Sequence, residues 1–127
     1  MKVIICGGRN YQMTFQDAIA LCSANIEYSF SEVVVGGASG ADADAETWAR
    51  ANAIRICRFP AEWGKHGGAA GPIRNEAMAR YADLIMAFPG GAGTADMVKR
   101  AKAHELESVN AWLSLHVEYA FKGASDG

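Results

Sequence analysis

Three glycine-rich segments of this 127-residue chain carry residue types that bind phosphate groups, and the strongest is FPGGAGT at residues 88–94. Glycines bring backbone N–H groups close to an anion, and a helix that follows adds free N–H groups and a positive dipole end. Thr94 can cap that helix or donate to a phosphate oxygen. The alternative is a tight strand-to-helix turn without a ligand, and no Gly-Lys-Ser/Thr follows to make a Walker loop. Three glycines behind a proline favour phosphate binding.

The other two segments, GGASGAD and GGRNY, also follow apolar runs. Ser39 and Asp42 have the spacing of a capping box, which is a purely structural use, whereas the glycines beside them favour a ligand. In GGRNY, Arg9 can pair with a phosphate and Tyr11 can stack on a base. A solvated arginine and a tyrosine at the edge of the core are the alternative for this segment.

A fourth segment, GPIRNEAM, opens a helix predicted at residues 72–81 with Pro72 in its first turn. Arg74 then also lies in the first turn, where the helix dipole disfavours a cation. An anionic ligand would offset that cost, and so would a salt bridge to Glu62 or Asp42. The four segments together predict a ligand site made of Gly7, Gly8, Arg9, Tyr11, Gly36, Gly37, Ser39, Gly40, Asp42, Arg74, Asn75, Pro89, Gly90, Gly91, Gly93 and Thr94.

Short apolar runs alternate with helical patterns along the chain. The runs predict strands at residues 3–6, 33–35, 54–59 and 84–88. Helices are predicted at residues 15–26, 42–52, 72–81 and 94–105, with a glycine-rich loop at 60–71. Thr14 can cap the first helix, whose apolar residues at helical spacing are Phe15, Ile19, Cys22 and Ile26. Val109, Ala111 and Leu113 indicate an edge strand, and Met78 and Tyr81 are assigned to the core.

This order of elements predicts an α/β fold: one Rossmann-like, three-layer domain with a mainly parallel sheet. Ligands in such sheets bind outside the carboxyl ends of the strands, where the winding reverses. The most turn-like glycine loops follow strands one and four, and the strand order 3-2-1-4-5 makes those two strands neighbours. We therefore expect that order, with the domain at residues 1–122 and a disordered tail at 123–127.

Composition argues against several other classes of protein. A formal net charge of −2 does not suit binding to nucleic acid by bulk charge. No apolar run is long enough to span a membrane, and the N-terminal one is too short for a signal peptide, so we expect a cytoplasmic protein. The widely spaced Cys6, Cys22 and Cys57 are interpreted as core thiols, and no histidine pattern indicates a metal site. The sequence predicts no cofactor.

The motifs GGRNY, GGASGADADAETWA, PAEW, GPIRNEAM and FPGGAGTADM together resemble the SLOG superfamily, named for the Smf/DprA and Lonely Guy proteins. The likeness covers residues 1 to about 105 and is greatest to the small YspA/YpsA-related (YAcAr) branch of bacteria and phages. It implies a Rossmann-like fold that binds nucleotides or nucleotide-derived signals, often as a dimer. Lonely Guy members cut the N-glycosidic bond of nucleoside monophosphates with the glutamate of PGGxGTxxE. That position is Met97 here, Asp96 precedes it, and the arginine of those enzymes maps onto Arg74.

The first hypothesis is therefore a phage or bacterial protein that senses or sequesters a nucleotide or an ADP-ribose-like molecule and assembles as a homo-oligomer. The second is a hydrolase of an N-glycosidic bond, for which Asp96 or Asp42 would supply the carboxylate and Arg74 would assist. A third hypothesis is binding of single-stranded nucleic acid, as in the DprA relatives. The net charge and the lack of a basic aromatic platform argue against nucleic acid as a partner.

Overall fold

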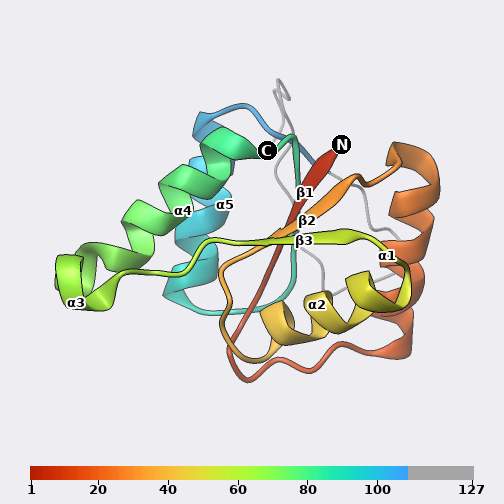
Figure 1. Cartoon of the computed structure of the whole chain (residues 1–127), viewed down its shortest axis with the longest axis horizontal. Helices are drawn as coiled ribbons and strands as arrows, with labels where there is room; N and C mark the ends of the chain where they lie inside the picture. The colour runs from red at the N-terminus through yellow and green to blue at the C-terminus, as the bar shows by residue number, and fades with distance from the viewer. Residues whose placement is uncertain (109–127) are drawn as a thin grey trace.

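The computed structural model describes residues 1–108 and contains a five-stranded parallel sheet in the order β3-β2-β1-β4-β5, which confirms the predicted order (Figure 1). The strands are β1 (Lys2–Cys6), β2 (Glu32–Val35), β3 (Arg55–Arg58), β4 (Leu84–Ala87) and β5 (Glu107–Ser108). The edge strand β5 lies just before the residues expected to form it. Val109, Ala111 and Leu113 fall outside the described residues, as does the predicted tail at 123–127.

Helices cover both faces of the sheet, which gives the expected three layers (Figure 1). On one face, α1 (Phe15–Tyr28) and α2 (Ala41–Ala51) pack on side chains that include Val3 and Ile5. On the other, α4 (Ala70–Tyr81) and α5 (Ala92–Ala103) pack on side chains that include Ile4 and Cys6. Successive side chains of a strand point to opposite faces, so β1 serves both cores and is buried on both sides.

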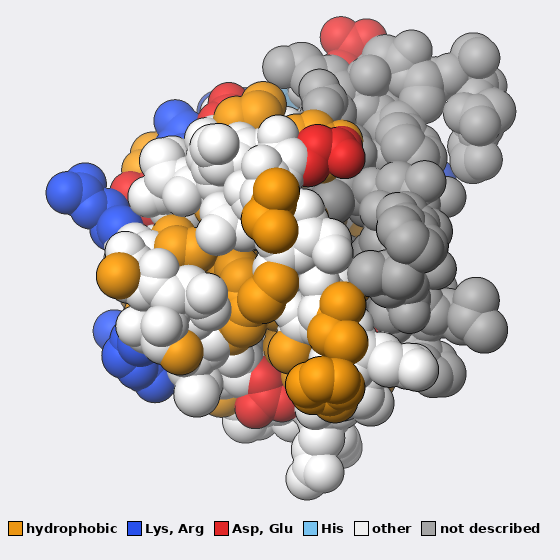
Figure 2. Space-filling model, turned by 90° about the vertical axis from the view of Figure 1, so that its right-hand side faces the viewer, with side chains coloured by type: hydrophobic (Ala, Val, Ile, Leu, Met, Phe, Trp, Pro, Cys, Tyr) orange, Lys and Arg blue, Asp and Glu red, His pale blue; other side chains and the backbone are white. Residues whose placement is uncertain are grey.

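The helix α1 begins as predicted but does not bury its apolar stripe. Thr14 accepts from the Asp17 backbone N–H and Asp17 accepts from that of Thr14, a complete capping box. The buried residues of the helix are instead Asp17, Ala20, Leu21 and Ala24. Phe15 and Ile26 are 80% and 83% exposed, and apolar side chains gather on this side of the molecule (Figure 2). The face of α1 that packs on the sheet includes the small residues Ala20 and Ala24. The helical spacing of larger apolar residues therefore predicted the helix but not its buried face.

Three further expectations about local structure were wrong. The segment predicted as a loop at 60–71 contains α3 (Trp63–His66) and a 3-10 turn (Gly67–Ala69). The helix α4 then begins at Ala70, before Pro72, so Arg74 lies in its second turn. The N-cap of α2 is Gly40, without a side-chain cap, and the predicted Ser39–Asp42 capping box is not formed.

Two core assignments also need correction. Cys22 is exposed, although Cys6 is buried and Cys57 is half-buried. Tyr81 is 37% exposed, with its hydroxyl donating to Glu32, whereas Met78 is buried as expected. No helix within residues 1–108 is long and apolar enough to cross a membrane.

Candidate phosphate-binding site

The three glycine-rich loops meet at the carboxyl edge of the sheet, as their places after β1, β2 and β4 require. The Gly8 N–H donates to Pro89 O at 2.8 Å, which joins the first loop to the loop after β4. The Gly8 carbonyl accepts from the Ala41 N–H at 3.1 Å, and the Ser39 hydroxyl donates to Arg9 O at 3.1 Å. These contacts join the first loop to the loop after β2. The sequence thus correctly grouped the three loops.

Several glycines in these loops are required by the packing of the chain itself. Gly40 has a φ of +69°, and a Cβ on it would lie 2.3 Å from Gly8 O and 2.4 Å from Arg9 O. A Cβ on Gly36 would lie 2.3 Å from Nη1 of Arg74. A Cβ on Gly90 would lie 2.7 Å from the Gly8 nitrogen. The close approach of one loop to another therefore explains Gly40 and Gly90 without a ligand, whereas a Cβ on Gly36 would first meet the end of the flexible Arg74 side chain.

Gly91 and Gly93 differ, because a Cβ added to either meets nothing within 4 Å among the described residues. Gly91 has a φ of −98° and a ψ of −145°, and Gly93 lies in the first turn of α5. Steric contact within the described chain therefore explains neither glycine. Both positions leave room for the backbone to be approached from outside.

The same two glycines form the uncapped N-terminus of α5. Its N-cap is Gly91, no side chain within residues 1–108 accepts from its first N–H groups, and its first turn has no acidic residue. The N–H groups of Ala92, Gly93 and Thr94 precede the first i to i−4 bond, from the Ala95 N–H to Gly91 O. The Thr94 side chain is nearly buried, at 8% exposed, and its hydroxyl has no hydrogen-bond partner within residues 1–108. Free N–H groups, a positive dipole end and a free hydroxyl are what an anion needs.

The loop after β2 is filled by the chain's own charged groups. Nη1 of Arg74 donates to Gly36 O at 2.9 Å and to Phe59 O at 3.3 Å, so this side chain joins the loops after β2 and β3. Oδ2 of Asp42 accepts from the N–H groups of Gly36 and Ala38. Burial raises the pKa of Asp42, although those two N–H groups and the charge of Arg74 lower it. Arg74 therefore has a structural role here whether or not it also contacts a ligand.

Comparisons with known proteins show the family and the fold. Residues 1–66 match the profile of the YspA, cpYpsA-related SLOG family (YAcAr).

The chain belongs to the YspA, cpYpsA-related SLOG family. It is also 34% identical over 119 residues to the Gene 61 protein of Mycobacterium phage D29. The aligned region covers 86% of this chain and 94% of that protein. Among solved structures, it is similar to the X-ray structure of TM1055, a Northeast Structural Genomics Consortium target. That similarity has a TM-score of 0.62 at 16% identity and covers 89% of this chain and 78% of the other. At this identity the solved structure shows the Rossmann-like fold alone.

The position of the Lonely Guy glutamate is not free in this SLOG chain. Met97 is 2% exposed and belongs to the core between the sheet and α4 and α5. The Asp96 carboxylate accepts from Arg100 Nε at 2.9 Å and from Asn75 Nδ2 at 3.0 Å. Although burial raises the pKa of Asp96, these two hydrogen bonds hold it below its ordinary value. Asp96 is thus an ionised group bound between α4 and α5.

Two other predicted site residues, Tyr11 and Arg9, differ in how available their side chains are to a ligand. Tyr11 stacks on Phe88, with ring centroids 5.9 Å apart, and its hydroxyl donates to Asp17. Burial and then that hydrogen bond raise its pKa. Arg9 has an exposed side chain that makes no hydrogen bond or ion pair with any residue the structure describes. Arg9 remains available to an anion, whereas one face of the Tyr11 ring is already covered.

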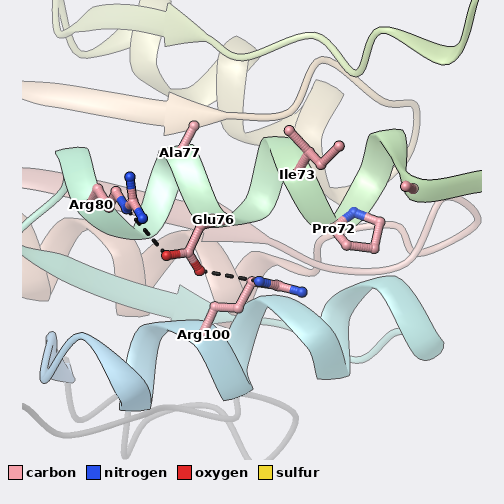
Figure 3. A pocket seen from close by; sticks show the side chains of 7 residues that line it. Pro72, Ile73, Glu76, Ala77, Arg80 and Arg100 are labelled. Atoms are coloured by element: carbon pink, nitrogen blue, oxygen red, sulfur yellow. Dashed lines mark hydrogen bonds and ion pairs between the residues drawn. The ribbon is translucent and has the colours of Figure 1, made fainter. Parts of the chain in front are cut away.

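An open cavity of about 560 Å³ is lined by side chains of α4, of α5 and of the turn before α4 (Figure 3). It is lined by Ala69, Pro72, Ile73, Glu76, Ala77, Arg80 and Arg100. Glu76 accepts from Arg80 and Arg100 across its floor, so the charges there are already paired (Figure 3). None of the residues predicted to bind the ligand lines this cavity. The sequence gave no signal for it, because its residues come from two helices that only the fold brings together.

Proposed function

We propose that this SLOG chain binds a nucleotide or a nucleotide-derived, ADP-ribose-like ligand, with a phosphate at the N-terminus of α5, and acts as a sensor or sequestering protein. Its fold and family are those of nucleotide-related Rossmann-like proteins. The relative in a phage is compatible with a phage-encoded protein.

One observation carries the proposal: a Cβ on Gly91 or Gly93 would meet nothing within 4 Å in the described chain, and both glycines lie at a helix end with free donors. A phosphate seated there would accept from the first N–H groups of α5 and from the Thr94 hydroxyl. A side chain at either glycine would lie in the path of the phosphate. This reasoning separates Gly91 and Gly93 from Gly40 and Gly90, which the packing of the chain itself explains.

The surroundings of Asp96 and Met97 favour binding of the ligand without its cleavage. Cleavage of an N-glycosidic bond needs a carboxylate near the sugar. Asp96 is bound by Arg100 and Asn75, and Met97 is a thioether within the core. Neither is suited to stabilise positive charge on a ribose or to activate water.

The experiment is a thermal-shift panel of AMP, ADP-ribose, NAD and cyclic nucleotides on the full chain. A ligand at a hundred times its Kd should add about 2.7 kcal/mol to the free energy of unfolding. Gly93→Val should abolish the shift, and Gly68→Val is a matched control, because Gly68 also has open space but lies outside the loop. The proposal fails if no compound shifts the melting temperature or if Gly93→Val binds as the wild type does. Chromatography of the same samples should recover the ligand intact, and release of free base that Asp96→Asn abolishes would favour the hydrolase.

A further inference from the structure

Trp63 is a large aromatic side chain that the fold leaves in solvent. It is 60% exposed, on the four-residue helix α3. The nearby Gly64, Gly67 and Gly68 have nothing within 4 Å of an added Cβ. No aromatic ring within residues 1–108 stacks on it, and its ring tip, Cη2, lies 3.5 Å from the Cβ position of Gly71. Exposing an indole to this extent gives up the free energy of burying it, so it is a candidate for contact with a ligand.

A chain of contacts runs along α4 from this ring to the N-terminal turn of α5. Gly71, which the ring approaches, lies in the first turn of α4, and Asn75 lies one turn further along the same side of that helix. Asn75 Nδ2 donates to Gly93 O at 3.3 Å. The two contact points on α4 are therefore about one helical turn, roughly 6 Å along the helix axis, apart. The ribose of a nucleotide bridges a gap of this order between its phosphate and its base.

Tyr11, the residue that the sequence predicted to stack on a base, is less available. Tyr11 is packed on Phe88 and bound to Asp17 through its hydroxyl. Trp63 has neither kind of constraint among the described residues, and both faces of an exposed indole can accept a base. The comparison favours Trp63 over Tyr11 as the residue on which a base stacks.

Resting on the proposed function, we propose that Trp63 is the stacking platform for the base of the ligand whose phosphate binds at the N-terminus of α5. The ligand class is then a phosphate that carries an aromatic base, rather than a sugar phosphate. Aromatic stacking tolerates any base, because every base has a π-face. Trp63 would thus contribute affinity for nucleotides as a class and not the choice among bases.

The test compares AMP with ribose 5-phosphate, which keeps the phosphate and lacks the base, by calorimetric titration of the full chain. We expect the wild type to bind AMP at least about tenfold more tightly than ribose 5-phosphate. Trp63→Ala should remove that difference and leave the affinity for ribose 5-phosphate unchanged. Trp63→Phe should keep most of it, since a ring remains. Phe15→Ala is the matched control, because Phe15 is 80% exposed on α1 and should affect neither probe.

Four outcomes would overturn the inference, and they differ in what they leave standing. Equal affinity of the wild type for both probes removes the base platform and keeps phosphate binding at α5. Equal loss of both probes in Trp63→Ala makes Trp63 a structural residue. An unchanged affinity for AMP with a changed oligomeric state, measured by light scattering, makes the exposed indole an interface between copies. Failure of the wild type to bind AMP, ADP-ribose, NAD and ribose 5-phosphate contradicts the proposed function as well.

Discussion

The glycine-rich loops after β2 and after β4 look alike in sequence, but in the structure their glycines are surrounded differently. In the loop after β2, Gly36 makes room for Arg74, and Gly40 makes room for the carbonyls of the first loop. In the loop after β4, Gly91 and Gly93 make room for nothing within the described chain. A glycine that packing explains says little about a ligand, whereas Gly91 and Gly93 combine open space with the free N–H groups of a helix end. The comparison predicts opposite effects for the same type of substitution in the two loops.

The largest effect is expected for Gly40→Ala. The alanine would have to adopt a φ near +69° with its Cβ 2.3–2.5 Å from backbone atoms of Gly8 and Arg9. Backbone strain of about 1–3 kcal/mol and overpacking of about 1–3 kcal/mol should together lower the free energy of unfolding by roughly 2–6 kcal/mol. Urea denaturation followed by circular dichroism measures this loss. A loss below 0.5 kcal/mol would show that the loops do not pack as closely as described.

Arg74→Ala should have the next largest effect. The substitution removes hydrogen bonds to Gly36 O and Phe59 O and leaves the Asp42 carboxylate without a neighbouring cation. Loss of hydrogen bonds from a charged group costs about 1.5–3 kcal/mol without any ligand. Arg9→Ala is the matched control, because Arg9 is an exposed arginine of the same edge and should leave stability unchanged. Equal melting temperatures of the two variants would make Arg74 a residue held mainly for a ligand.

Asp42 gives the loop after β2 a pH dependence with a definite sign. Its pKa is raised in the folded state, so the protein should lose stability relative to Asp42→Asn as the pH rises from 3.8 through the folded-state pKa. Well below 3.8 the carboxyl is protonated in both the folded and the unfolded state, so the difference between the two proteins should no longer change with pH. Denaturation of both proteins between pH 3 and pH 7 measures it. A wild type that instead gains stability relative to Asp42→Asn over this range would show that Arg74 and the two N–H groups outweigh burial.

The smallest effect, and one of opposite sign, is expected for Gly93→Ala. Replacing an open helical glycine with alanine should stabilise the unliganded protein by about 0.4–1 kcal/mol. The same change should weaken ligand binding, because the methyl group lies where the phosphate approaches. Thermal denaturation with and without AMP measures both effects. Destabilisation without ligand would place Gly93 in the same structural class as Gly40.

The sequence predicted the strand order and the meeting of the three loops because these follow from local patterns and from the rules of parallel sheets. Thr14 was identified as a cap because its partner is three residues away. The partners of Arg74 could not be predicted, since Gly36 is 38 residues away and only the fold brings the two together. The exposed stripe on α1 has a similar cause, because the alanines that cover the sheet carry little hydrophobic signal. Likewise, the sequence does not distinguish a glycine whose Cβ would meet other atoms from one whose Cβ would meet open space. Only the folded structure shows that difference.

The most direct test of the central claim is to follow the backbone amide resonances of the ¹⁵N-labelled chain while AMP is added. A phosphate at the N-terminus of α5 accepts from the first N–H groups of that helix. The amide resonances of Ala92, Gly93 and Thr94 should therefore shift most, and their shifts should saturate at the same AMP concentration. Amides beside the cavity between α4 and α5, such as those of Glu76 and Arg100, should shift much less. The account is contradicted if AMP saturates the protein while the amides of residues 91–94 stay in place.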